Sequence, residues 1–220
     1  MTRISVKMIL SLVSAAIIFC SSTLNGQIIG GIKVDANMSN FFLSDMDGVE
    51  SKLGFGVSVG GYTKIKLTNC LGLQPEVLLH YKTSTIEQAM DEVDYQYFGV
   101  EIPIYTVGET ELWGGKGFVG IGPYIGVGID ARYKSDLYKN NPNFEDDYLD
   151  LYKEYGNEKS AMQRFDFGAG LMLGYEFTNR LQILATYKIG FIDALNSNKD
   201  NASMTNQTIS LGLGYRLSTK

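Results

Sequence analysis

The chain has 220 residues, of which 45% are hydrophobic and 12% aromatic, enough apolar surface for the core of one folded domain. Its 24 acidic residues outnumber the 19 basic ones, and the net charge of −5 excludes the basic surface that nucleic-acid binding requires. The two cysteines, Cys20 and Cys70, are too few for a disulfide framework or a zinc cluster.

The first 26 residues have the three regions of a secretory signal peptide. Arg3 and Lys7 form the charged region, an apolar run over residues 8–19 follows, and small and polar residues lead to Gln27. The apolar run is too short for a permanent transmembrane helix, so we expect residues 1–26 to be cleaved. Cleavage removes two bases and no acid, which leaves 17 basic against 24 acidic residues and a net charge of −7.

Cys20 offers an alternative, lipid attachment at a lipoprotein cleavage site. That pattern requires a small residue directly before the cysteine, and Phe19 stands there, so ordinary cleavage is favoured. Beyond the signal the sequence has no run of about 20 apolar residues, which excludes a helical membrane anchor. Residence in a membrane would therefore require a closed β-barrel.

From residue 29 onward, apolar residues alternate with glycine, polar or charged residues, the period of a β-strand with two different faces. The pattern is clearest over residues 164–177 and 181–190, which a turn at Thr178, Asn179 and Arg180 joins. In chain order, strands are expected over residues 29–39, 54–67, 71–82, 95–106, 117–130, 164–177, 181–190 and 208–217.

The connections between these strands alternate long and short. Long polar segments are expected at residues 40–53, 83–94, 131–162 and 193–205, and shorter turns at 68–70, 107–115 and 178–180. Outer-membrane barrels sort their connections in this way, whereas a soluble sandwich has no reason to do so. The sequence therefore predicts an all-β fold: an eight-stranded antiparallel up-and-down transmembrane β-barrel over residues 27–220, with short periplasmic turns and longer outer loops. Because the strand number is even, both termini are expected in the periplasm.

Three residues of the predicted barrel have two interpretations each. Pro75 and Pro123 lie inside strands, where each either marks a bulge or removes a hydrogen bond from the ladder. Trp113 lies in a predicted turn, either as an anchor at the membrane interface or as a locally packed turn residue.

Five short motifs follow the strands in a particular order and spacing. They are Gly31-Ile32-Lys33 with Asn37-Met38-Ser39-Asn40, Leu73-Gln74-Pro75-Glu76, Val100-Glu101-Ile102-Pro103, Gly120-Ile121-Gly122-Pro123-Tyr124 and Gly214-Tyr215-Arg216. Together they resemble the PorT-type outer-membrane β-barrel family of Bacteroidetes. The resemblance implies an eight-stranded outer-membrane barrel and, for the founding member, a part in protein secretion. Residues 131–162 have no counterpart in the family pattern.

The polar face of the predicted strands carries both acids and bases into the lumen. They are Lys33, Asp35, Lys64, Lys66, Glu76, Lys82, Glu101, Arg164, Asp166, Glu176, Lys188 and Arg216. An eight-stranded barrel is filled by its inward side chains, so these charges are expected to pair into a plug rather than to line an ion or solute pathway. Glu101 or Asp166 is expected to pair with Arg164, Lys188 or Arg216 on a neighbouring strand.

The sequence supports no catalytic, cofactor-binding or metal assignment. His80 is the only histidine and faces inward near the outer rim, where barrel enzymes place their sites, with Ser84 and Asp94 nearby. No nucleophile motif accompanies it, so a polar lumen residue is favoured. Residues 45–50 resemble a fragment of a calcium loop but lack its further ligands, which favours a solvated acidic loop.

The long outer segment 131–162 is predicted to contain a helix. Asn143 can cap it, acidic residues fill its first turn and Gly156 can end it. Its apolar face, formed by Tyr148, Leu151, Tyr152 and Tyr155, either packs over the barrel mouth or binds a partner or ligand.

These observations favour a non-enzymatic outer-membrane barrel that serves as an envelope component or binds partners through its outer loops. Its expected surroundings are outer-membrane lipid and an extracellular or secretion-machine protein. A component of a PorT-type secretion or transport machine is the alternative, and an outer-membrane barrel enzyme is a more distant one.

Overall fold

The computed structural model of the chain describes residues 28–44, 50–51, 54–88, 91–135, 149–152, 164–192 and 203–217. All regular structure within these residues is β. The strands are β1 (Ile28–Ser44), β2 (Glu50–Ser51), β3 (Gly54–Lys66), β4 (Leu71–Gln88), β5 (Asp91–Leu112), β6 (Gly115–Ser135), β7 (Leu149–Asp150), β8 (Phe165–Glu176), β9 (Leu181–Gly190) and β10 (Ser203–Arg216).

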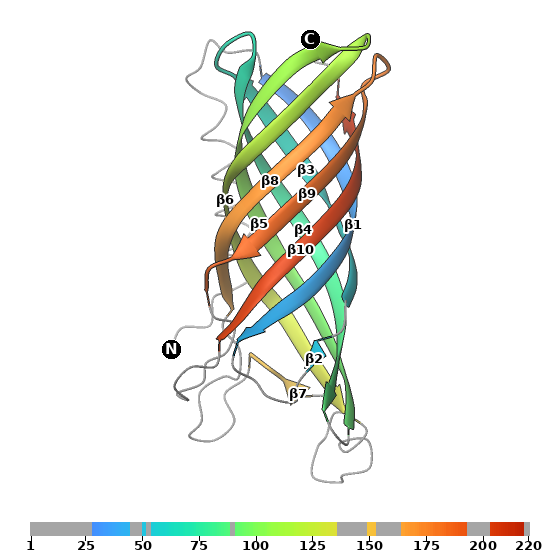
Figure 1. Cartoon of the computed structure of the whole chain (residues 1–220), viewed down its shortest axis with the longest axis vertical. Helices are drawn as coiled ribbons and strands as arrows, with labels where there is room; N and C mark the ends of the chain where they lie inside the picture. Colours follow the sequence, from blue (N-terminus) through green and yellow to red (C-terminus); the bar gives the residue numbers. More distant parts are fainter. Residues whose placement is uncertain are drawn as a thin grey trace.

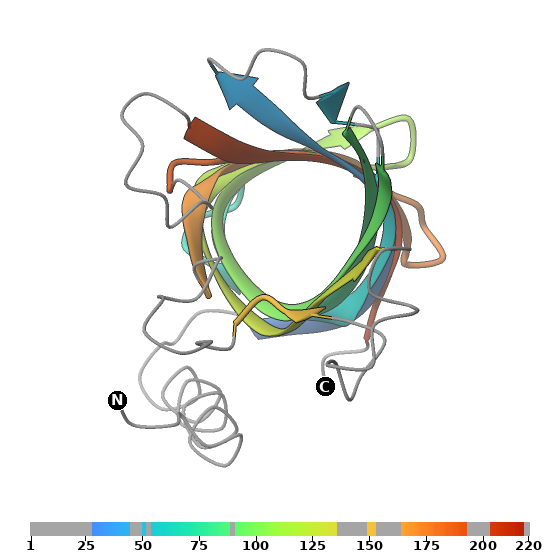
Figure 2. The same cartoon turned by 90° about the horizontal axis from the view of Figure 1, so that it is seen from below.

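Eight long strands close into one antiparallel barrel (Figures 1 and 2). The ring runs β4-β3-β1-β10-β9-β8-β6-β5 and returns to β4, so each strand pairs with its neighbours in the chain and β1 pairs with β10. The two short strands stand outside the ring, where β2 pairs with β4 and β7 with β6. The predicted eight-stranded up-and-down barrel is confirmed, and all eight predicted strands are present.

The three short connections lie at one end of the barrel, together with the start of β1 and the end of β10 (Figure 1). The first and last strands of the ring meet at this end, where the Leu217 amide donates to the Gly30 carbonyl at 2.9 Å. Short turns face the periplasm in outer-membrane barrels, so we refer to this as the periplasmic end and to the opposite one as the outer end.

The turn predicted over residues 107–115 is wrong. Strand β5 continues to Leu112, which pairs with Gly115, and only Trp113 and Gly114 form the turn. Both have positive φ, 49° and 80°, as a two-residue hairpin loop of type I′ requires. The alternation of inward and outward residues in fact continues through residues 107–112, and the glutamates and glycine there conceal it.

The outer strands extend beyond the predicted limits, so part of each outer segment is not a loop. Strands β4 and β5 pair as far as Gln88 and Asp91, which makes most of residues 83–94 a hairpin, and β1 and β10 pair as far as Ser44 and Ser203. Outside the membrane both faces of a strand meet water. The apolar face that identified the strands therefore ends before their hydrogen bonding does.

The prolines interrupt the ladder without shifting it. Around Pro75 the β3–β4 ladder skips from the pair Tyr62 and Glu76 to the pair Ile65 and Leu73, with no change of register. A similar gap lies beside Pro123 in the β5–β6 ladder. The interpretation that each proline removes hydrogen bonds from the ladder is therefore confirmed, and neither proline marks a bulge.

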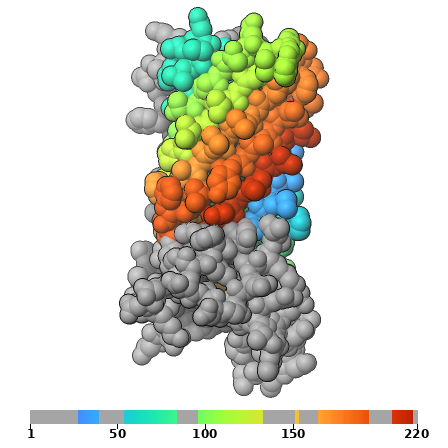
Figure 3. Space-filling view, viewed as in Figure 1, coloured from blue at the N-terminus to red at the C-terminus, as the bar shows by residue number. Residues whose placement is uncertain are grey.

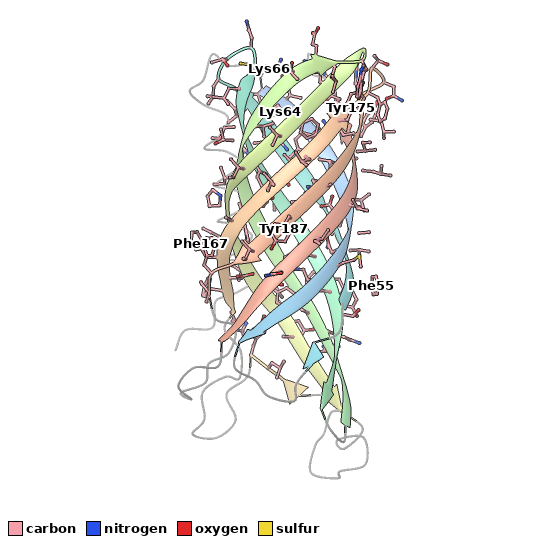
Figure 4. The ribbon with its side chains drawn as sticks, viewed as in Figure 1. Phe55, Lys64, Lys66, Phe167, Tyr175 and Tyr187 are labelled. Atoms are coloured by element: carbon pink, nitrogen blue, oxygen red, sulfur yellow. The ribbon has the colours of Figure 1, made fainter. Side chains whose placement is uncertain are left out.

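The outer wall is apolar and carries aromatic residues at both ends of the barrel. Phe55 and Phe167 project from it at the edges of Figure 4, Tyr187 is 41% exposed on it, and Tyr175 lies at the periplasmic end. Trp113 is 88% exposed at the tip of its turn, which fits an interfacial anchor and not a packed turn residue. On the face shown in Figure 3, β8, β9 and β10 form a continuous surface. No helix among the described residues is long and apolar enough to span a bilayer.

Candidate functional site: the barrel lumen

An apolar cluster lies in the lumen toward the periplasmic end. It consists of Tyr105, Val107, Phe118, Met172 and Leu184, all buried and contributed by four of the eight strands. The Phe118 ring occupies the space in which a β-carbon at Gly174 would stand, so inward glycines make room for large neighbours. This cluster is not among the predictions from the sequence; its signal is the few bulky residues placed among the inward glycines.

A network of charges lies at the periplasmic end, next to the short turns. Glu109 accepts from Lys64 at 2.9 Å and has Lys66 at 3.6 Å and Lys116 at 3.8 Å. Lys64 and Lys66 are labelled in this region in Figure 4. One carboxylate thus faces three ammonium groups, so the network is cationic.

A second charged pair lies at the same end of the barrel and joins β8 and β10. The Arg216 guanidinium donates to Glu176 at 2.7 Å, and the Gln182 amide donates to the same carboxylate at 2.7 Å. These side chains come from β10, β8 and β9, so the pair joins the last three strands.

Further into the lumen, Lys33 on β1 joins two acids. Its ammonium lies 3.0 Å from Glu76 on β4 and 3.4 Å from Asp35 on its own strand. The Gln74 amide donates to the other oxygen of Glu76 at 2.8 Å. All four side chains are buried, so these contacts substitute for water.

The outer half of the lumen contains a fourth polar group. Glu101 pairs with Lys188, and Lys82 donates to the Thr208 hydroxyl at 3.1 Å. Nearby, Asp166 accepts from the Tyr124 hydroxyl at 3.2 Å and from the Asn206 amide at 3.3 Å. Acids and bases are therefore distributed through the lumen in partnered groups.

The predicted ion pair between Glu101 and Lys188 is confirmed, but the two residues do not lie on neighbouring strands as expected. Glu101 lies on β5 and Lys188 on β9, which are not neighbours, so the pair crosses the lumen. The lumen is narrow enough for long side chains to reach a distant strand. Arg216 pairs with Glu176 instead, and Asp166 accepts hydrogen bonds from the neutral Tyr124 and Asn206.

Arg164 lies at the barrel mouth and is not one of the buried lumen charges, contrary to the prediction. It is exposed, lies over the Tyr152 ring at 4.8 Å and donates to the Tyr152 carbonyl at 3.3 Å. It stands one residue before β8 begins, where its side chain stacks on the buried Tyr152 ring in the barrel mouth.

Several buried polar atoms of the lumen have no hydrogen-bond partner. They are the Asp35 Oδ1, Asn37 Oδ1, Tyr62 hydroxyl, Ser210 Oγ and both ring nitrogens of His80. Buried polar groups are ordinarily satisfied by protein or water. The lumen therefore contains buried donor and acceptor atoms in addition to those of the pairs described above.

His80 is inward-facing and 3% exposed, as predicted for a lumen residue. Its Nδ1 lies 3.9 Å from Glu101, and its ring packs against Tyr97 with centroids 5.4 Å apart. Ser58, opposite it on β3, accepts from the Asn37 amide at 2.5 Å. A nucleophile bonded to His80 is thus not found among the described side chains, and those of Ser84 and Asp94 lie outside them.

No group of three or more metal-binding side chains occurs in the described part of the chain. The calcium-like segment 45–50 lies outside the described residues except for Glu50, which belongs to β2. The predicted signal peptide, residues 1–26, lies outside them as well. Cys70 is a free, exposed thiol in the turn between β3 and β4.

The segment 131–162 departs from the prediction where it is described. Leu149–Asp150 forms β7 and pairs with β6, so the expected helix is wrong at these residues. Strand β6 continues past the first residue of β8, and its open edge gives β7 a hydrogen-bonding partner that outweighs helix propensity. The proposed cap Asn143 and end Gly156 lie outside the described residues.

Leu151 and Tyr152 follow β7 and are both buried, at 8% and 6% exposed. The Leu151 amide donates to the Ala131 carbonyl at 3.0 Å, and the Tyr152 ring occupies the space beside Gly128 on the inner wall. This part of the insert therefore packs into the barrel mouth.

The motifs that resemble the PorT-type family meet in the lumen. Six of their inward residues take part in contacts given above: Lys33, Gln74, Glu76, Glu101, Tyr124 and Arg216. The motifs lie between residues 31 and 216 of the sequence, yet these side chains come together in the polar interior of one barrel.

Comparison with known proteins gives a family and several solved structures. The family described as "Outer membrane protein beta-barrel domain" matches residues 11–216. Neisserial surface protein A is 13% identical, with 86% of this chain and 97% of that chain covered and a TM-score of 0.47. OprG from Pseudomonas aeruginosa is 10% identical, with 90% and 100% covered and a TM-score of 0.47. The outer membrane enzyme PagL is 12% identical, with 84% and 99% covered and a TM-score of 0.43. No curated protein matches.

Proposed function

Because the chain belongs to the outer membrane protein beta-barrel family and lies in the outer membrane, we propose that it is a non-enzymatic envelope component that binds a partner through its outer parts. The packed lumen carries this proposal. The apolar cluster around Phe118 and Met172 fills the interior, and charges on either side of it are partnered. Because eight strands enclose a lumen that inward side chains can fill, little space remains for a solute, and we place partner binding on the surfaces of the barrel.

The parts beyond the membrane offer such a surface. Strands β4, β5 and β6 continue outward as a three-stranded sheet, with β2 paired to one edge and β7 to the other (Figure 1). Residues 131–162 join this sheet through β7 and carry, besides the buried Tyr152, four tyrosines among many acids. Tyrosine provides large contact area at little cost in side-chain entropy, which suits a protein partner.

Two measurements test the proposal. Folded protein in planar bilayers is expected to show no steady conductance, since the lumen is filled. Crosslinking in native membranes is expected to capture a protein through residues 136–163, and a linker in their place should remove that product. A stable, voltage-independent conductance would contradict the filled lumen, and an unchanged crosslinking pattern would contradict binding through this segment.

A part in a PorT-type secretion or transport machine of Bacteroidetes is a second proposal. It is supported by the family-like motifs, whose inward residues form a single network that includes Lys33 and Glu76. A machine subunit should co-purify with other envelope proteins in mild detergent, and loss of the gene should block export of a cargo. A barrel that elutes alone, with secretion intact in its absence, would count against this role.

For the enzyme alternative, His80 is the relevant residue. Both its ring nitrogens lack a partner, and a general base needs a nucleophile within hydrogen-bond reach. Incubation of solubilised protein with phospholipid and peptide substrates is expected to give no product. Turnover that is lost in His80→Ala would overturn the non-enzymatic part of the proposal.

A further inference from the structure

The apolar outer wall of the barrel ends along β4, β5 and β6 at a defined line near the outer end. Three rows of cross-strand neighbours cross it: Leu79, Val100 and Val127, then Tyr81, Phe98 and Asp130, then Thr83, Gln96 and Arg132. The first row is aliphatic, the second is mainly aromatic and the third is polar. This order is the one expected where hydrocarbon gives way to lipid headgroups.

A β-bulge in β6 places Asp130 and Arg132, the two charged residues of these rows, on the outer wall of this outer rim. The β5–β6 register shifts between Phe98 and Gly99, so that Ile129 is an extra residue on β6. Below the bulge, the even-numbered residues of β6 face the lumen. Beyond it Ala131 takes the inward side, at 0% exposed, and Arg132 faces outward. Bulges re-aim side chains in this way, and without this one Arg132 would point into the lumen.

An open pocket of about 310 Å³ lies over the second and third rows. It is lined by Tyr81, Gln96, Tyr97, Phe98, Asp130 and Arg132. At one side the Asp130 carboxylate accepts from the Arg132 Nε at 2.8 Å, with the two side chains 39% and 44% exposed. Tyr81 and Phe98, 41% and 37% exposed, form the side toward the membrane.

The chemistry of the pocket favours a hydroxyl-rich ring. The Arg132 and Asp130 charges cancel, so the pair selects neither a simple anion nor a simple cation. Arginine brings only donors, the carboxylate brings only acceptors, and the Gln96 amide brings both. Sugar hydroxyls both donate and accept, and the C–H face of a sugar ring packs on aromatic side chains. We propose that this pocket binds the sugar headgroup of a glycolipid in the outer leaflet, whose acyl chains lie along the apolar wall below it.

Lipid binding to the folded full-length barrel tests the proposal. Native mass spectrometry in detergent would compare a neutral diglycosyl diacylglycerol with a phosphatidylglycerol of the same acyl chains. We expect the glycolipid to bind more tightly, and Arg132→Ala and Gln96→Ala each to weaken it about tenfold, the usual effect of losing a hydrogen bond to a charged or buried polar group. Lys116→Ala, which removes an exposed cation at the periplasmic end, is the matched control and should leave binding unchanged.

Each other outcome overturns the proposal. Equal binding of the two lipids, both weakened by Arg132→Ala, would show a phosphate or general anion site. Glycolipid binding that resists both rim substitutions, or that Lys116→Ala weakens equally, would show non-specific adsorption. Heat-modifiable migration on SDS gels confirms that each variant is folded before it is compared. Because Gln96→Ala removes no charge, it keeps the test open if Arg132→Ala fails to fold.

Discussion

At the scale of single residues, the lumen charges stabilise the barrel only while they remain paired. Glu101 and Lys188 are 3% and 6% exposed, and removal of one leaves the other as a buried charge. Such a loss costs about 3–5 kcal/mol, whereas removal of both costs less. We therefore expect Glu101→Gln or Lys188→Met to lower stability strongly and the double variant to recover part of the loss. Thermal unfolding in detergent measures the effect, and single variants as stable as the wild type would refute it.

Lys116 provides the comparison for a pair that water can reach. It lies 3.8 Å from Glu109 with a side chain that is 40% exposed. Exposed pairs contribute about 0–1 kcal/mol. Lys116→Met should therefore change the unfolding temperature far less than Lys188→Met, and similar losses from both would show that burial does not decide the energy of these pairs.

The inward and outward glycines should differ in what they tolerate. A β-carbon at Gly122 would overlap the Ile104 carbonyl oxygen, whereas one at Gly108 would meet nothing nearer than Val119 at 3.9 Å. Overpacking against backbone costs about 1–3 kcal/mol. We expect Gly122→Ala to destabilise the barrel by this order and Gly108→Ala to be nearly neutral. Urea unfolding of the two variants in the same detergent distinguishes them, and equal stabilities would contradict the close approach of β5 and β6 at this point.

At the scale of whole elements, the two-residue alternation identified the eight strands because the lipid face must be apolar throughout the membrane. It could not identify the ends of β4 and β5, since water on both faces removes the pattern while the hydrogen bonds continue to Gln88 and Asp91. It also could not show β7, whose pairing depends on the open edge of β6 and not on its own residues. The cross-lumen contact of Glu101 depends on the curvature of the barrel, which no local pattern contains.

The barrel ring and the insert should separate in a deletion experiment. Strand β10 joins β9 to β1 and closes the ring, whereas β7 pairs only with the outer part of β6. Replacing residues 136–163 with a short glycine-serine linker is expected to leave a barrel that resists SDS until heated, because the closed ladder has no edge. Removing residues 203–217 should abolish that resistance. If the linker variant also loses it, the insert is part of the scaffold.

At the scale of the whole molecule, the sorting of the connections by end determines how the barrel sits in the membrane. Cys70 lies in the turn between β3 and β4, exposed, at the end where the short turns gather. If this end faces the periplasm, a polymer-linked maleimide too large to cross the outer membrane should label Cys70 only after the membrane is permeabilised. Removal of the predicted signal would leave Cys70 as the single thiol, so the labelling site needs no further engineering. A matched variant, Cys70→Ser with Gln88→Cys at the outer end of β4, should be labelled on intact cells. Labelling of Cys70 but not of the Gln88→Cys variant on intact cells would show that the short turns lie outside and that the barrel is inverted. Residue 70 directly precedes β4 and residue 88 ends it, so the two proteins report on opposite ends of the barrel.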